Sequence, residues 1–152
     1  MLRWWEVIMR KPCLMAIALS FLFLTPFAAF AGDFDGSKPL LCASIKVFEC
    51  SQAEGCQEVT LEDVGLPQFS IIDFKEKIIR PTKESGLDRT TRIENLKHIG
   101  GKLILQGAEE GLEDLKDGLG WTIAVSEESG TWVLTASGEG VAFVVSGACT
   151  PR

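Results

Sequence analysis

His98 is the only histidine in the chain, so any catalytic system that relies on an imidazole base must use it. A serine or cysteine nucleophile needs such a base within hydrogen-bonding distance, and a third group that orients the base. The hairpin expected around residues 100–101 places His98 beside a turn, on the core-facing side of its strand. A lone histidine in that position is usually packed against its neighbours or exposed at the rim. We therefore expect no catalytic residue and no enzymatic activity, and treat His98 as a candidate ligand contact.

Four cysteines follow residue 31, and their even number indicates two disulfides rather than a thiol nucleophile. Three pairings are possible. We expect Cys50 to bond to Cys56, because only a short polar loop separates them. Cys42 is then left to join Cys149, which links the first expected strand to the last. The spacing of Cys50 and Cys56 does not fit a zinc site, and no second pair or histidine cluster completes one. No metal or other cofactor is expected.

Trp121, Trp132 and Phe143 are the main candidates for contacting a ligand. Aromatic side chains that line the mouth of a β-barrel can hold one small apolar molecule. The alternative is a filled core, because the interior of an eight-stranded barrel is just wide enough for side chains alone. The sequence leaves both alternatives open.

Residues 109–119 form an acidic stretch and the one segment with helical character, since Leu112 and Leu115 lie three residues apart. The segment is either a solvated loop or short helix, or the contact surface for a basic partner. It lacks the glycine-centred ligand spacing of a calcium loop. Its acidic residues, the candidate partner-binding groups, are Glu109, Glu110, Glu113, Asp114 and Asp117.

Three consecutive antiparallel strands near the C-terminus must position the aromatic residues. Residues 121–125, 132–136 and 141–145 are rich in β-branched and aromatic side chains, and turn residues separate them. In the first pairing, a loop with an even residue count sets Trp121, Ile123 and Val125 opposite Ala136, Leu134 and Trp132. In the second, a two-residue turn at Gly138-Glu139 sets Ala136, Leu134 and Trp132 opposite Val141, Phe143 and Val145. A slip of one residue would turn these side chains toward water.

Residues 40–49 alternate between two faces, which indicates a half-buried strand. Cys42 lies on one face, and the other face carries Leu41, Ala43, Ile45 and Val47. Cys149 instead shares the parity of the core-facing residues of its own strand. A bulge, or a bridge at the rim, is therefore needed to join the two cysteines.

Weaker strands lie between these elements. We expect an edge strand over residues 57–64, a hairpin around Lys75-Glu76, and a second hairpin around Gly100-Gly101 that pairs His98 with Leu103 and has a bulge near Ile93. The chain as a whole predicts an antiparallel meander of about eight or nine short strands. We expect a closed or nearly closed barrel, lipocalin-like in architecture, because closure removes exposed sheet edges. A β-sandwich is the alternative.

Residues 1–31 have the features of a cleavable secretory signal peptide. Arg10 and Lys11 precede an apolar run over residues 13–24, and Ala29-Phe30-Ala31 is a small-x-small cleavage site. Met9 is as plausible a start as Met1. A membrane anchor is the alternative, but the run is short and Pro26 interrupts its end. We expect a periplasmic or extracellular protein. Residues 32–152 should form a single all-β domain, with residues 32–39 as a flexible lead-in.

The chain is acidic, with a formal charge of −6 at pH 7. Removal of residues 1–31 takes away three basic residues and one acidic residue, which brings the charge to −8. Such a balance argues against nucleic acid and against anionic membrane surfaces as partners.

The C-terminal third resembles small secreted bacterial proteins in which a Gly-Trp strand, a Ser-Gly turn, a Leu-Thr-Ala strand and a closing Phe-Val-Val-x-Gly-Ala-Cys segment follow one another. Here these are Gly120-Trp121, Ser129-Gly130, Leu134-Thr135-Ala136 and residues 143–149. The early Cys42, the late Gly147-Ala148-Cys149 and the meander are also similar to the periplasmic inhibitors of C-type lysozyme. That resemblance implies a small barrel whose last strand carries a disulfide cysteine.

The sequence therefore favours an exported bacterial envelope protein that binds a small apolar molecule without catalysis. The alternative is an interaction or enzyme-inhibitor protein whose acidic surface meets a basic partner.

Overall fold

The computed structural model describes residues 33–111 and 118–152, which form ten β-strands and one short 3₁₀ helix. The expected signal peptide and most of the predicted acidic helix lie outside these residues. The elements are β1 (Leu40–Ser51), β2 (Gly55–Val59), β3 (Phe69–Asp73), β4 (Ile78–Pro81), η2 (Lys83–Ser85), β5 (Thr91–Arg92), β6 (Asn95–Ile99), β7 (Lys102–Glu109), β8 (Leu119–Ser126), β9 (Thr131–Ser137) and β10 (Val141–Pro151).

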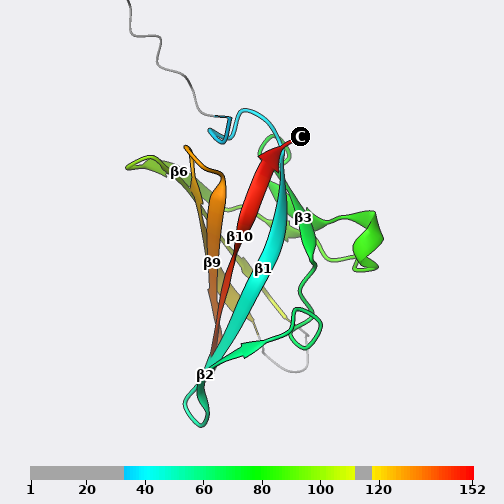
Figure 1. The fold of residues 1–152 in the computed structure, drawn as a ribbon, viewed down its shortest axis with the longest axis vertical. Coiled ribbons are helices and arrows are strands. Elements are labelled where there is room, and N and C mark those ends of the chain that lie inside the picture. Colours follow the sequence, from blue (N-terminus) through cyan, green and yellow to red (C-terminus); the bar gives the residue numbers. More distant parts are fainter. Residues whose placement is uncertain (1–32, 112–117) are drawn as a thin grey trace, which may run out of the picture. The chain divides into compact units, whose positions relative to one another are not determined.

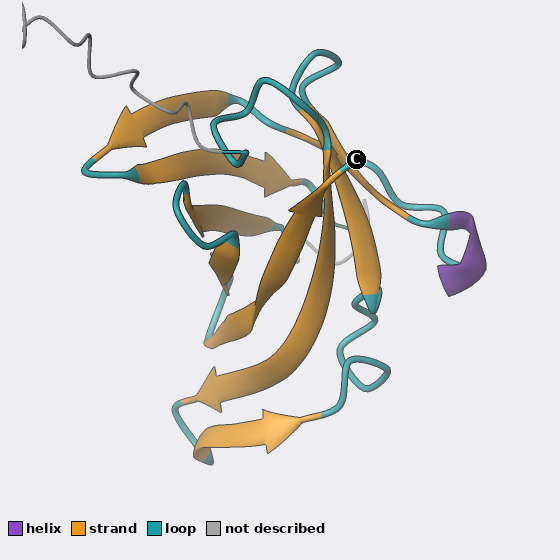
Figure 2. Ribbon diagram, turned by 45° about the horizontal axis from the view of Figure 1, so that its top comes forward, coloured by secondary structure: helices purple, strands orange, loops and turns teal. Residues whose placement is uncertain are grey.

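The strands form one antiparallel sheet in the order β5-β4-β3-β1-β10-β9-β8-β7-β6, with β2 paired to β1 beside this path. The first and last strands are neighbours, and β10 lies between β1 and β9 (Figure 1). The sheet curls strongly around its inner face (Figure 2). The all-β meander and the nearly closed barrel predicted from the sequence are thus confirmed.

The two ends of the sheet, β5 and β6, are consecutive in the chain, and only residues 93 and 94 separate them. The Ile93 backbone N–H donates to the Lys77 carbonyl at 2.9 Å, and the Glu94 N–H donates to the Gln106 carbonyl at 2.9 Å. One short segment therefore pairs first with the β4 side and then with β7. Asn95 is also the ladder partner of Gln106, so Glu94 and Asn95 both lie opposite this one residue. This arrangement is a β-bulge, and the bulge predicted near Ile93 is confirmed.

The face assigned to the first half of β1 was wrong. The register against β10 shifts between Ser44 and Lys46, and Ile45 is 65% exposed. This bulge inverts the alternation, so Leu40 and Cys42 are buried before it and Val47 is buried after it. The same shift removes the conflict between the cysteines, because Cys42 lies directly opposite Cys149.

Both predicted disulfides are present. Cys42 bonds to Cys149 across 107 residues of sequence, and Cys50 bonds to Cys56 across 6. The first disulfide joins β1 to β10, and the second joins β1 to β2. Paired cysteines of this kind indicate an oxidising environment and hence an exported protein.

The pairing of β8 with β9 matches the prediction at each position, with Trp121 opposite Ala136 and Val125 opposite Trp132. The pairing of β9 with β10 is displaced by two residues, so that Ala136 lies opposite Phe143. The turn residues are Glu139 and Gly140 instead of Gly138 and Glu139: the Gly138 N–H donates to the Val141 carbonyl, and Gly140 takes the positive φ of 75° that the turn requires. A shift of two residues keeps every side chain on its predicted face.

One end of the barrel is covered by the segment that precedes β1, which was expected to be a flexible lead-in. This segment has no regular secondary structure, but Phe34 packs against the core. A Cβ atom added to Gly36 would lie 3.4 Å from Leu103 and 3.6 Å from Phe74, which shows how closely the segment lies over this end. We call it the closed end; the β3–β4, β6–β7 and β8–β9 turns surround it.

Candidate functional site: an apolar cavity in the barrel

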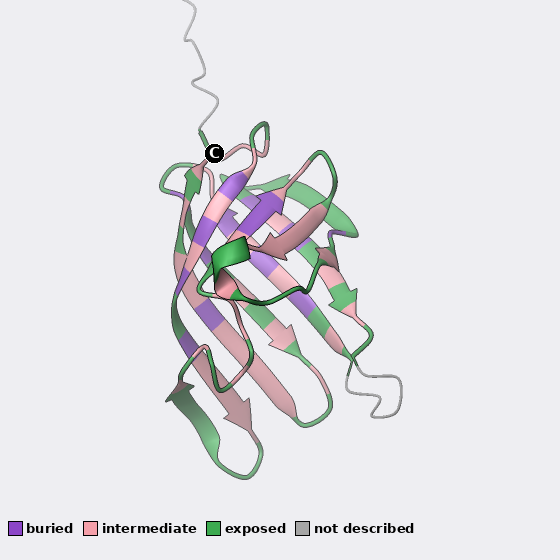
Figure 3. Cartoon of the chain, turned by 90° about the vertical axis from the view of Figure 1, so that its right-hand side faces the viewer, coloured by how far each residue is buried: buried purple, intermediate pink, exposed green. Residues whose placement is uncertain are grey.

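The barrel wall is incomplete on one side because its strands differ in length. β1 and β10 span 12 and 11 residues, whereas β3, β4 and β5 span 5, 4 and 2 residues. Away from the closed end, two loops take the place of strands: residues 60–68 after β2, and residues 82–90 after β4. Figure 3 shows the exposed η2 helix and its loop in front of the inner strands.

A cavity of about 410 Å³ lies behind these loops. This volume is within the range of roughly 300–1,000 Å³ that is typical of small-molecule sites. The lining is largely apolar and comes from both loops and from the inner face of the sheet. Its apolar side chains include Val64, Leu66, Ile72, Ile79, Leu87, Leu119, Trp121, Ile123, Trp132, Leu134, Ala136, Phe143 and Val145.

Three of the four sequence-predicted ligand contacts, Trp121, Trp132 and Phe143, line this cavity together. Trp121 and Trp132 are each only 6% exposed. The indole N–H of Trp121 donates to Thr91 Oγ1 at 3.2 Å, and that of Trp132 donates to the Ala43 carbonyl at 3.1 Å. Because both polar groups are already hydrogen-bonded, the rings present their apolar surface to the cavity.

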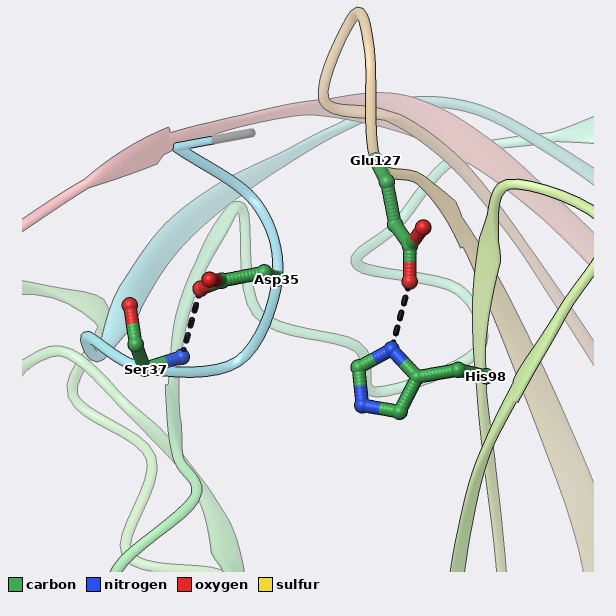
Figure 4. A network of polar contacts seen from close by, with 4 residues as sticks. All are labelled: Asp35, Ser37, His98 and Glu127. Atoms are coloured by element: carbon green, nitrogen blue, oxygen red, sulfur yellow. Dashed lines mark hydrogen bonds and ion pairs between the residues drawn. The ribbon is translucent and has the colours of Figure 1, made fainter. Parts of the chain in front are cut away.

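His98 does not line the cavity; of the two positions expected for it, packed or exposed at the rim, the structure shows the exposed one. The pairing of His98 with Leu103 is as expected, but β6 is exposed along its length, and the His98 side chain is 54% exposed. Its Nδ1 lies 2.5 Å from Glu127 Oε1 in the β8–β9 loop (Figure 4). β6 is the last strand of the sheet in this order. His98 lies on the same face as the buried Leu103, but no strand follows β6 to shield it from solvent.

Asp35 lies close to this pair at the closed end (Figure 4). Hydrogen bonds from Ser37, including one from its backbone N–H at 2.8 Å, lower the pKa of the Asp35 carboxyl. The charge of His98 contributes a smaller lowering of the same pKa. These exposed contacts hold the turns of the closed end and have no part in the cavity.

Charged residues contribute to the cavity lining from β4, from the loop after it and from the end of β7. They are Arg80, Asp88, Arg89 and Glu109. Arg89 Nη2 forms an ion pair with Glu109 Oε2, which joins the 82–90 loop to β7. The Arg89 side chain is 62% exposed and the Glu109 side chain 23%, so the pair lies where the cavity meets solvent. We call this region the mouth.

The acidic stretch of residues 109–119 is only partly described. Glu109 belongs to β7 and lines the mouth, and Glu110 follows that strand. Glu113, Asp114 and Asp117 lie outside the described residues. No sequence pattern indicated Arg89 as a site residue, because its partner Glu109 is 20 positions away and the loop before β5 is irregular.

Within residues 33–111 and 118–152, no group of three or more His, Cys, Asp and Glu side chains is placed to hold a metal ion. No helix in the described part of the chain is both long enough and apolar enough to cross a membrane.

Fold and cavity together define a class of protein: a small, disulfide-linked antiparallel barrel with an apolar internal cavity. No family of known proteins, no curated protein and no solved structure matches this chain. The functional argument therefore rests on the cavity and its residues.

Proposed function

We propose that this protein is exported to the bacterial periplasm or the cell exterior, and that it binds one small apolar molecule in its barrel without catalysing a reaction. The observation that carries this proposal is the cavity of about 410 Å³, with Trp121, Trp132 and Phe143 in its lining. A core that only had to stabilise the fold would be filled, because protein interiors are packed as densely as organic crystals. The paired cysteines support export.

The test is to fill the cavity and measure binding of N-phenyl-1-naphthylamine, a neutral apolar probe that fluoresces when it leaves water. Ala136 lines the cavity from β9, so Ala136→Trp places an indole in the space that the probe would occupy. Ala124 on β8 has the opposite parity to the buried Ile123 and Val125, so Ala124→Trp adds the same group to the outer face.

We expect A136W to weaken probe binding at least tenfold and A124W to leave it unchanged, with both variants retaining the β-sheet circular dichroism of the parent. Saturable binding that A136W does not alter would place the probe elsewhere and contradict the proposal. Of the acidic residues in the alternative partner-binding surface, Glu109 is already paired with Arg89.

A further inference from the structure

We infer that the ligand is a single-chain amphiphile with an anionic head group, a carboxylate or a phosphate, and that Arg89 binds this head at the mouth. The inference rests on the proposed function and adds the chemical class of the ligand. It follows from where the charged residues of the cavity lie and from how Arg89 is held.

The inner part of the cavity is apolar, and charged residues lie at its mouth. Its inner part is formed by buried side chains of the sheet, such as Ile123 and Val145, which are 2% and 1% exposed. The ion pair of the lining, Arg89–Glu109, joins the 82–90 loop to the end of β7, where the cavity meets solvent. A molecule that fits both parts has an apolar chain that points inward and a charged group that stays at the mouth.

Arg89 is suited to hold an anion because Glu109 already positions it. The ion pair joins Nη2 of Arg89 to one oxygen of Glu109. A guanidinium carries five N–H donors in a rigid plane, so one such contact leaves donors for a second oxygen acceptor. Glu109 therefore acts as a positioning residue that restricts the Arg89 side chain before the ligand binds.

The sign of the head group follows from the same contact. Glu109 is the less exposed member of the pair, at 23% against 62% for Arg89, so an incoming head group meets the guanidinium before the carboxylate. An anionic head accepts from the free N–H groups of Arg89, while Asp88, the other carboxylate of the lining, repels it and limits the gain. Arginine remains protonated at every physiological pH, so this preference does not depend on titration of the protein.

The experiment compares ligands that share one chain and differ in the head. Dodecanol, dodecanoate and dodecyl phosphate compete with N-phenyl-1-naphthylamine for the parent protein, for Arg89→Gln and for Lys83→Gln. Lys83 lies in η2 on the same loop but does not line the cavity, so K83Q removes the same charge without touching the mouth. Arg89→Lys keeps the charge and removes the planar fork, and it serves if R89Q fails to fold.

We expect R89Q to weaken dodecanoate, dodecyl phosphate or both by about three- to tenfold, and R89K to weaken them less. Dodecanol should bind every variant equally, and K83Q should behave as the parent. The ligand whose affinity R89Q lowers more, dodecanoate or dodecyl phosphate, identifies the head group that Arg89 prefers. Equal losses of affinity for the two mean that Arg89 recognises charge alone.

Equal weakening of dodecanol and dodecanoate by R89Q would overturn the inference, as would an equal effect of K83Q. In both cases the proposed function would stand. If dodecanol does not displace the probe from the parent protein, the proposed function itself fails, and the inference fails with it.

Discussion

Trp132 on β9 lies directly opposite Gly147 on β10, and its indole N–H reaches across that glycine to the Ala43 carbonyl on β1 at 3.1 Å. A Cβ atom at Gly147 would collide with both the indole Nε1 and the Ala43 carbonyl oxygen. The indole therefore covers a position where no side chain fits, and it connects three strands. Trp121 likewise lies directly opposite a glycine, Gly107 on β7, and a Cβ atom at Gly107 would collide with its indole ring.

Gly147→Ala should destabilise the protein by about 1–3 kcal/mol, because the added methyl group must displace either the indole or the β1 backbone. Gly120→Ala is the matched control: Gly120 also lies in a strand, its φ is not positive, and a Cβ atom there meets nothing within 4 Å. We expect G120A to change stability by less than about 0.5 kcal/mol. Urea unfolding followed by tryptophan fluorescence measures both, and equal effects would refute the close approach.

Loss of the Cys42–Cys149 disulfide should cost more stability than loss of Cys50–Cys56. The first closes a loop of 107 residues and the second a loop of 6. In the chain-entropy model these loops are worth about 5 and about 2 kcal/mol, respectively. Double replacement of each pair by alanine, followed by urea unfolding, gives the comparison. Similar losses in the two variants would show that the unfolded chain is not the main source of the stabilisation.

Affinity for neutral ligands should rise with chain length until the cavity is full. Each buried methylene contributes roughly 0.8 kcal/mol, which is about fourfold in the dissociation constant. Competition by decanol, undecanol and dodecanol against N-phenyl-1-naphthylamine measures this slope. The same series on A136W should be nearly flat, and a flat series on the parent would mean that the chain does not enter the barrel.

Asp63 should titrate below its usual range, because Thr60 donates to its Oδ2 from Oγ1 at 2.6 Å and from its backbone N–H at 3.1 Å, and these bonds lower the pKa of the carboxyl. The folded pKa then lies below the unfolded one. The resulting stabilisation is present above the unfolded pKa and is lost as the pH falls through the folded pKa.

Carboxyl-carbon NMR titration of the parent and of Thr60→Val tests this. T60V removes the hydroxyl donor and keeps the backbone N–H, so the pKa of Asp63 should rise partway toward its usual value. An unchanged pKa in T60V would show that the hydroxyl bond is not the main cause. The contact matters for the site, because the Thr60–Asp63 turn leads directly into Val64 and Leu66 of the cavity lining.

Side-chain facing could be predicted where alternation is strict and a loop has only one reasonable length. This held for β8 and β9. For β6 and β7 around Gly100-Gly101 the pairing was predicted correctly, but β6 is exposed along its length. It failed for β1, because the parity conflict between Cys42 and Cys149 indicated a bulge but not its position, and the bulge at Ile45 inverts the parity of the residues before it. The β9–β10 register was wrong by two because Gly138 and Gly140 both offer a turn, and the two registers bury the same faces.

The sequence by itself determined the class of the fold, the pairing of the cysteines and the inward direction of Trp121, Trp132 and Phe143. Those properties depend on a two-residue periodicity and on spacing along the chain, which are local. Only the tertiary structure decided that a cavity remains among these side chains, and that Arg89 meets Glu109 at its mouth. Empty volume and an ion pair between distant residues depend on how short strands and loops from separate parts of the chain close one wall, and no local pattern encodes that.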